Sequence, residues 1–271
     1  MNRVGSMADR QRRVKKIHQL LQEAIFFSVQ ELSERLGVSS MTIRRDLDHL
    51  AELGLIQRLH GGAMWREPEQ SLGQREHLHI TEKTAIAEEA LARIRPGETI
   101  ALDSGTTTAK LAECIVASDI RPLTVITHAL NVATILMADP RIHVHVAGGD
   151  LRPGTASLTG PRCRRFFQEV HVERAFMTAA GVTRDEGLTN SNFSEAEIKS
   201  AMREAADEVH VLVDGSKWGQ RSMVSFAHLT QVHEIISDLE IDLDWTMILH
   251  QAGVRFSHAR TASHLLGEGL Q

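Results

Sequence analysis

The N-terminal part of the chain consists of short apolar stripes separated by glycine and serine. Between about residues 10 and 23, four apolar side chains recur at the spacing of a helix, which predicts a helix with one buried face. They are Val14, Ile17, Leu20 and Leu21. Ser28 and Glu31 then stand three residues apart, as in a capping box, and predict the start of a second, short helix.

A third helix follows after a tight break. Gly37 can adopt the left-handed conformation that ends the second helix, and Ser39 is placed to cap the next one. Its inward positions are Ile43, Leu47 and Leu50. Two close helices joined by such a turn predict a helix–turn–helix, in which the first residues of the second helix meet base edges and phosphates.

Two short apolar strands around Gly61 predict a β-hairpin wing after the third helix. Each arginine taken alone is also compatible with a solvated helix face. The turn, the cap, the exposed arginine pair and the basic wing occur together, however, and this combination favours a winged helix–turn–helix. We expect it to bind double-stranded DNA through Ser39, Ser40, Thr42, Arg44, Arg45, Arg58, His60 and Gly61.

From Thr81 the pattern changes to strands that alternate with helices. The strands are expected in "TIALD", "LTVITH", "HVHVAGG", "RAFMTAAG", "EVHVLVDGS" and "HEIISD". This alternation predicts an α/β fold with a mainly parallel, Rossmann-like sheet, whose ligands bind at the carboxyl ends of the strands. The expected organisation is a DNA-binding domain over residues 1–66, a linker over 67–80 and an effector domain over 81–271.

Polar residues follow several of these strands. "LDSGTTTAKLAE" places a glycine and several hydroxyl groups between a strand and a helix, an arrangement that suits a phosphate. Without a ligand, the same stretch would be an ordinary capped turn between a strand and a helix. Lys217, which follows a later strand, would be an ordinary surface lysine. Neither the ATP-binding nor the dinucleotide-binding glycine pattern occurs, so no cofactor is expected. The candidate effector-binding residues are Asp103, Ser104, Gly105, Thr106, Thr107, His128, Gly149 and Lys217.

The charge is distributed unevenly along the chain, which indicates that its two parts have different functions. The net charge is −5, but residues 1–66 hold eleven Lys and Arg against seven Asp and Glu, or +4, and the remainder carries −9. The sequence has no apolar run of the roughly twenty residues that cross a bilayer and no signal-peptide pattern, so we expect a cytoplasmic protein without membrane contact. Cys114 and Cys163 lack metal-ligand spacing.

The run "VSSMTIRRDLDHLAELGLIQRLHGGA" resembles the N-terminal signature of the DeoR family of bacterial sugar-metabolism regulators. "LDSGTTT", "GGDLRPGTASLTGP", "AFMTAAGV", "GLTN", "EAEIKSAM" and "DGSKWG" are similar to motifs of the effector domain of that family. The resemblance implies a fold like that of ribose-5-phosphate isomerase and glucosamine-6-phosphate deaminase. It also implies that residues 103–107 and Lys217 hold a phosphorylated sugar.

This sequence departs from the family pattern at three positions. Ser40 stands where the family usually has an acidic residue, His128 where it has asparagine, and Trp218 where it has phenylalanine. Imidazole can gain a charge near neutral pH and then bind a phosphate more strongly. One hypothesis is therefore that the effector affinity of the wild-type protein rises as the pH falls, and more steeply than that of His128→Asn. A histidine that fills space at a strand end is the alternative.

Catalysis needs a base that moves a proton between carbons. The related isomerases have acids directly after the strand that corresponds to "RAFMT", but "AAGVT" follows here; Asp103 and Glu195 remain nominal candidates. No catalytic residue is therefore assigned. No metal ligand is assigned either, because no third ligand is evident near His143 and His145, and His77 and His79 lie in the expected linker.

We predict a DNA-binding repressor of a sugar or polyol operon that responds to a phosphorylated effector and acts as a homodimer or homotetramer. The alternatives are a phosphosugar isomerase or deaminase with a DNA-binding head, and a constitutive DNA-binding protein with a degenerate body.

Overall fold

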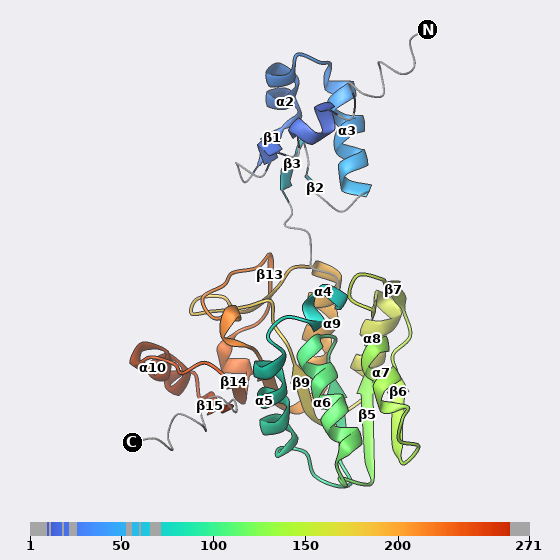
Figure 1. Cartoon of the computed structure of the whole chain (residues 1–271), viewed down its shortest axis with the longest axis vertical. Coiled ribbons are helices and arrows are strands. Elements are labelled where there is room, and N and C mark those ends of the chain that lie inside the picture. The colour runs from blue at the N-terminus through green and yellow to red at the C-terminus, as the bar shows by residue number, and fades with distance from the viewer. Residues whose placement is uncertain are drawn as a thin grey trace. The chain divides into compact units, whose positions relative to one another are not determined.

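Two structural units follow one another along the chain, and each has its own hydrophobic core. The computed structural model describes residues 10, 12–17, 19–21, 26–52, 56–59, 61–65 and 72–260. The units comprise Met1–Glu69 and Gln70–Gln271 (Figure 1).

The N-terminal unit is a winged helix–turn–helix, as predicted. Residues 12–17 and 19–21 are helical, and two further helices follow, α2 (Val29–Leu36) and α3 (Ser40–Glu52). The wing strands β2 (Ile56–Leu59) and β3 (Gly62–Trp65) pair antiparallel, and β1 (Phe27–Ser28) pairs with the other edge of β3. The sequence did not reveal β1, because two residues are too few to show a strand period.

The local signals at the helix ends act as expected. The side chain of Ser28 accepts the N–H of Glu31 at 3.1 Å, and the Glu31 carboxylate accepts the N–H of Ser28 at 2.8 Å, which completes the capping box. Gly37 ends α2 at φ 64°. The core beneath these helices contains Ile17, Leu21, Leu32, Ile43, Leu47 and Leu50.

The C-terminal unit is built on a seven-stranded sheet in which every neighbouring pair is parallel. The strand order is β15-β14-β12-β9-β4-β5-β6. The strands are β4 (Thr99–Leu102), β5 (Leu123–Thr127), β6 (Ile142–Val146), β9 (Val172–Met177), β12 (Ala206–Leu212), β14 (Glu234–Ser237) and β15 (Arg255–His258). The predicted α/β class is confirmed, and β15 is the strand that the sequence pattern missed.

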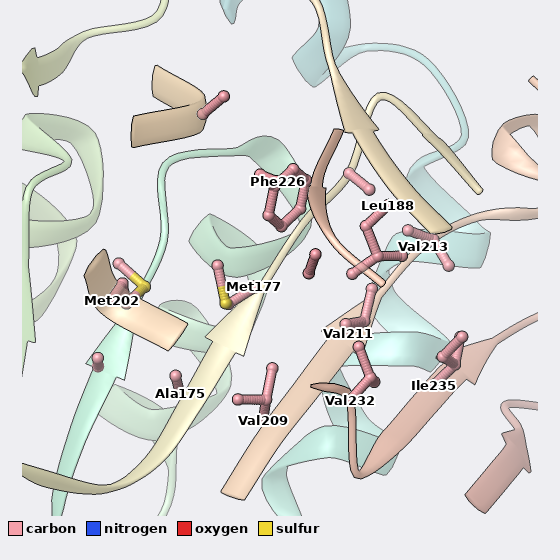
Figure 2. Close-up of a cluster of buried hydrophobic side chains, with 14 of the residues drawn as sticks. Ala175, Met177, Leu188, Met202, Val209, Val211, Val213, Phe226, Val232 and Ile235 are labelled. Atoms are coloured by element: carbon pink, nitrogen blue, oxygen red, sulfur yellow. The ribbon is translucent and has the colours of Figure 1, made fainter. Parts of the chain in front are cut away.

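Helices cover both faces of this sheet. One buried cluster joins it to α5 (Ile80–Leu91), α6 (Thr106–Ala117) and α7 (Leu130–Leu136). The other joins it to α8 (Pro161–Glu169), α9 (Phe193–Glu204) and α10 (Leu243–Gln251). Figure 2 shows part of the second cluster, where valines of β12 lie near Met177 of β9 and Phe226. The sheet is therefore a rigid centre whose strand ends can position a site.

Smaller elements surround the strand ends. A hairpin is formed by β7 (Asp150–Arg152) and β8 (Ser157–Thr159). A separate antiparallel sheet contains β10 (Gly181–Thr183), β11 (Gly187–Asn190) and β13 (Val224–Ala227), and short 3₁₀ helices span Gly215–Lys217 and Leu229–Gln231. None of the described helices has the length and apolar character needed to cross a membrane.

Part of the stretch expected as a linker is helical. Within residues 67–80 the structure has α4 (Leu72–Glu76) and the first residue of α5. The N–H of Leu72 donates to the carbonyl of Gly154 at 2.8 Å, and Lys83 donates to the carbonyls of Arg75 and Leu78 at 2.6 and 2.5 Å. These hydrogen bonds with later parts of the chain hold residues 72–78 in place. The sequence did not reveal α4, because five residues are too few to show a helical period.

Candidate DNA-binding surface and effector site

The start of α3 is held by two of the predicted DNA-binding residues. The hydroxyl of Ser39 accepts the N–H of Thr42 at 3.3 Å and lies 3.0 Å from the hydroxyl of Thr42. Ser39 therefore acts as the N-cap, as its position predicts. Both hydroxyls contribute to the helix end itself, which leaves the outward side chains of the first turns for an external partner.

Ser40, Arg44 and Arg45 are exposed, whereas Ile43 and Leu47 of the same helix are fully buried. Neither arginine forms an ion pair within the described part of the chain. A solvated cationic pair at the start of such a helix is suited to phosphate oxygens and base edges.

The wing residue Arg58 is engaged within the unit. Its Nε donates to Asp48 of α3 at 3.1 Å, and its NH1 donates to the carbonyl of Gly62 at 2.8 Å. Gly61 forms the wing turn at φ 83°, and its carbonyl accepts the N–H of Val29 at 2.8 Å. Arg58 thus ties the wing to the recognition helix, and His60 lies outside the described residues.

In the C-terminal unit, Asp103 follows β4 and is completely buried. One carboxylate oxygen accepts the Nζ of Lys199 and the N–H and hydroxyl of Thr178, the latter two at 2.8 and 3.0 Å. Burial alone would raise the pKa of Asp103, but the positive charge of Lys199 and the hydrogen bond to His128 hold it well below its ordinary value. Asp103 is therefore an ionised link between three strand ends and α9.

Lys199 was missed in the sequence. It is 2% exposed, and besides Asp103 its Nζ donates to the carbonyl of Thr178 at 3.0 Å. A signal was present, because Glu195 and Lys199 are four residues apart among the apolar residues of "EAEIKSAM" and so share one helix face. Charged residues on the apolar face of a helix indicate a buried polar network.

His128 follows β5 and is also fully buried. Its Nδ1 lies 3.0 Å from the carbonyl of Leu158, so Nδ1 carries a hydrogen. Its Nε2 lies 3.1 Å from Asp103 and 3.3 Å from the N–H of Ser104. The ring is thus enclosed and partnered on both nitrogens, a placement that favours the interpretation of a histidine that fills and ties a strand end.

A second buried carboxylate, Glu195 of α9, lies under the β7-β8 hairpin. It accepts the hydroxyls of Thr155 and Ser157 at 2.6 and 2.8 Å, the amide of Asn190 at 3.2 Å and Arg152 Nε at 3.3 Å. Burial opposes ionisation, but these donors and the charge of Lys199 lower the pKa of Glu195 to about 2. Glu195 is consequently a fixed acceptor and a poor proton carrier.

The loop after Asp103 contains hydroxyl groups of a different kind. Thr108 donates to the carbonyl of Asp103 at 2.8 Å, but the hydroxyls of Ser104, Thr106 and Thr107 make no hydrogen bond within the described residues. The first turn of α6 also presents N–H groups that have no partner inside the helix. Gly105 lets this loop approach β9, because a Cβ there would lie 3.0 Å from the side chain of Thr178.

Lys217 ends the 3₁₀ helix that follows β12, and Asp214 caps that helix through the N–H of Ser216 at 3.0 Å. Lys217 is half-buried and makes no hydrogen bond or ion pair through its side chain among the described residues. Burial lowers the pKa of the neighbouring Lys83, opposed by the charge of Asp214 and assisted by that of Lys217. Since β9 alone separates β12 from β4, the two strands lie about 10 Å apart.

Gly149 has a packing explanation. Its φ is 148°, and a Cβ there would lie 2.3 Å from the carbonyl oxygen of Thr159. The described residues contain no cluster of three or more histidine, cysteine or acidic side chains that could hold a metal ion. Along the strand ends, Asp103 and Glu195 are fully hydrogen-bonded acceptors, so neither is placed as a free general base.

Comparison with known proteins assigns both units. Residues 13–69 match the family model of the DeoR-like helix-turn-helix domain, and residues 78–239 match that of the DeoR C terminal sensor domain. The chain belongs to the DeoR family. It is a transcriptional regulator that binds DNA through its helix–turn–helix and senses an effector through its C-terminal domain.

Relatives match along most of their length. The HTH-type transcriptional regulator GlpR of Haloferax volcanii is 34% identical, with 89% of this chain and 95% of the relative covered. The glycerol-3-phosphate regulon repressor of Escherichia coli is 31% identical, over 82% and 88%. The regulator IolR of Bacillus subtilis is also 31% identical, over 85% and 92%.

Solved structures are similar at a greater distance. Ribose 5-phosphate isomerase A of Methanocaldococcus jannaschii is 20% identical, with 50% of this chain and 53% of that chain covered at a TM-score of 0.37. The eIF2B delta subunit of Chaetomium thermophilum is 14% identical over 74% and 65%, at a TM-score of 0.42.

Proposed function

We propose that this regulator represses a sugar or polyol catabolic operon, and that a phosphorylated sugar or polyol bound at residues 103–107 and Lys217 controls its affinity for the operator. One observation carries the proposal. At the strand ends the carboxylates are saturated with hydrogen bonds, whereas three hydroxyls of the loop, the first N–H groups of α6 and the ammonium of Lys217 are unengaged in the described residues.

These free groups are all hydrogen-bond donors. A helix N-terminus with hydroxyls and a nearby cation is a favourable environment for a phosphate, whose oxygens only accept. Because only β9 separates β4 from β12, the loop after β4 and the lysine after β12 lie at the same edge of the sheet, about 10 Å apart along it. Within this proposed site, the buried contacts of Asp103, His128 and Gly149 hold the loop in place, and the unengaged donors of residues 104–107 and Lys217 are the groups that would contact the phosphate.

The names of the relatives support the same class of effector. One is a repressor of a glycerol-3-phosphate regulon, and another, 34% identical, is the lactose phosphotransferase system repressor of Streptococcus mutans. The first name contains a phosphorylated polyol, and the second a sugar and a phosphotransferase system. We propose the same class of phosphorylated effector for the present chain. We also propose that the protein acts in the cytoplasm and binds DNA as a homodimer or homotetramer.

The test is a thermal-shift screen of the full chain with glycerol 3-phosphate, several sugar phosphates, the corresponding unphosphorylated compounds and inorganic phosphate. A compound that binds only the folded state raises the Tm. For the best compound, Lys217→Met is expected to weaken binding about ten- to a hundredfold, because a charge-assisted hydrogen bond is lost. Fluorescence of Trp218, the next residue, offers an independent titration signal.

Lys110→Met is the matched control, since Lys110 lies on α6 but is paired with Glu113 at 2.7 Å. Equal affinities of the two variants would remove Lys217 from the site. A screen in which no phosphorylated compound raises the Tm would instead favour the constitutive DNA-binding protein. Titration of operator-bound protein with the compound then shows whether it releases or promotes DNA binding.

A further inference from the structure

The first turns of α3 present one large apolar side chain to solvent. Met41 is 61% exposed, between the exposed Ser40 and the half-buried Thr42. A single exposed apolar residue is unremarkable on most protein surfaces. Here it lies on the part of a helix–turn–helix whose residues meet the bases.

The geometry of the helix gives Met41 a special direction. With 3.6 residues per turn, Met41 lies roughly 160° around the axis from the fully buried Ile43. Arg45, four residues later, lies on the same outward line, whereas Arg44 lies roughly 100° from Ile43, on the flank. Met41 and Arg45 therefore point most directly away from the core, toward a partner that faces this helix.

Nearby polar side chains are already engaged. The hydroxyls of Ser39 and Thr42 hold the start of the helix, and Arg58 is bound to Asp48 and to the carbonyl of Gly62. Among the predicted DNA-binding residues that the structure describes, Ser40, Arg44 and Arg45 remain exposed and without such a contact. An apolar, flexible thioether is a poor partner for phosphate oxygens and suits apolar groups of the DNA, among which the base edges differ with sequence.

We propose that Met41 is a specificity-determining residue that packs on the 5-methyl group of a thymine in the major groove, beside the base that Arg45 contacts. The proposal rests on DNA binding through α3 and adds a base preference to it. The thymine methyl is the one alkyl group that the major-groove edge of a base pair offers. An alanine at position 41 is too short to replace this contact but leaves the helix intact, because the side chain is exposed.

The experiment uses the full chain and a pool of DNA duplexes randomised over about two helical turns. Wild type, Met41→Ala and Met137→Ala are each used to select duplexes. Met137 is the matched control, since it is 73% exposed and lies after α7 in the other unit. In the DNA sequence that the wild-type protein selects, each thymine is then replaced in turn by uracil, which removes only the methyl group.

We expect one thymine per half-site at which uracil weakens wild-type and Met137→Ala binding about fourfold, the effect of one buried methyl group. At that thymine, uracil should cost Met41→Ala nothing further, and Met41→Ala should no longer select thymine there. Uracil tolerated at every thymine, or equally harmful to wild type and Met41→Ala, would overturn the role of Met41 alone. If the wild-type chain selects no common sequence, DNA recognition by α3 fails and this proposal with it.

Discussion

The two units use their polar residues in opposite ways. In the N-terminal unit, Ser40, Arg44 and Arg45 of α3 are exposed, and the engaged side chains of Ser39, Thr42 and Arg58 hold the helix end or the wing. At the strand ends of the C-terminal unit, Asp103 and His128 are fully buried, and the unengaged donors lie on the loop that follows Asp103 and at Lys217.

The partners proposed for the two surfaces differ in size. DNA is larger than the domain and binds at its surface, so exposure identifies the groups that can touch it. A small ligand needs a concave site held in place by buried hydrogen bonds. In such a site, exposure is a poor guide, and an unused donor next to a saturated network is the better one.

The largest expected effect is a loss of stability when the buried pair of Asp103 and Lys199 is broken. Lys199→Met leaves the Asp103 carboxylate buried without its cation, which should lower the free energy of unfolding of this unit by about 3–5 kcal/mol. Urea denaturation followed by the fluorescence of Trp218 and Trp245 measures it. Asp103→Asn combined with Lys199→Met should cost less than the sum of the single changes. A loss no larger than that of Lys110→Met would mean that Lys199 is not part of a structural pair.

The next effect concerns the surface of α3. Replacing Arg44 and Arg45 together with alanine should weaken operator binding at least tenfold without changing the fold, since each good contact is worth about 1–3 kcal/mol. Circular dichroism checks the fold, and titration of labelled operator measures affinity. The outward direction of Arg45 predicts relaxed base preference in Arg45→Ala, and the flanking Arg44 predicts uniform weakening with a shallower salt dependence. Unchanged affinity of the double variant at physiological salt would refute the assignment.

The smallest effect concerns Glu195 and depends on pH. Because the pKa of Glu195 in the folded protein, about 2, is below its ordinary 4.5, the ionised carboxylate stabilises the fold above about pH 4.5. That stabilisation is lost as the pH falls toward 2. Glu195→Gln should therefore cost about 1–3 kcal/mol near neutral pH, and the gap to wild type should narrow below pH 4.5. Urea denaturation at a series of pH values tests this, and a gap that stays constant would contradict it.

Much of the fold could be predicted because its signals are local. The capping box of Ser28 and Glu31, the left-handed Gly37 and the N-cap Ser39 each act within three or four residues. The alternation of strands and helices likewise needs only neighbouring residues, and parallel strands gather their carboxyl ends at one edge. The sequence by itself therefore determined the winged helix–turn–helix, the α/β class and the loop after Asp103.

Only the tertiary structure decided which polar groups are engaged. Asp103 meets Lys199 across 96 positions of the sequence, and Arg152 and Thr155 meet Glu195 across 43 and 40. Such pairs depend on the strand order and on where the β7-β8 hairpin packs, and neither leaves a period in the sequence. An acceptor is satisfied by whichever donor the fold brings within about 3 Å. The unused donors of a site can therefore be identified only when the positions of all the surrounding residues are known.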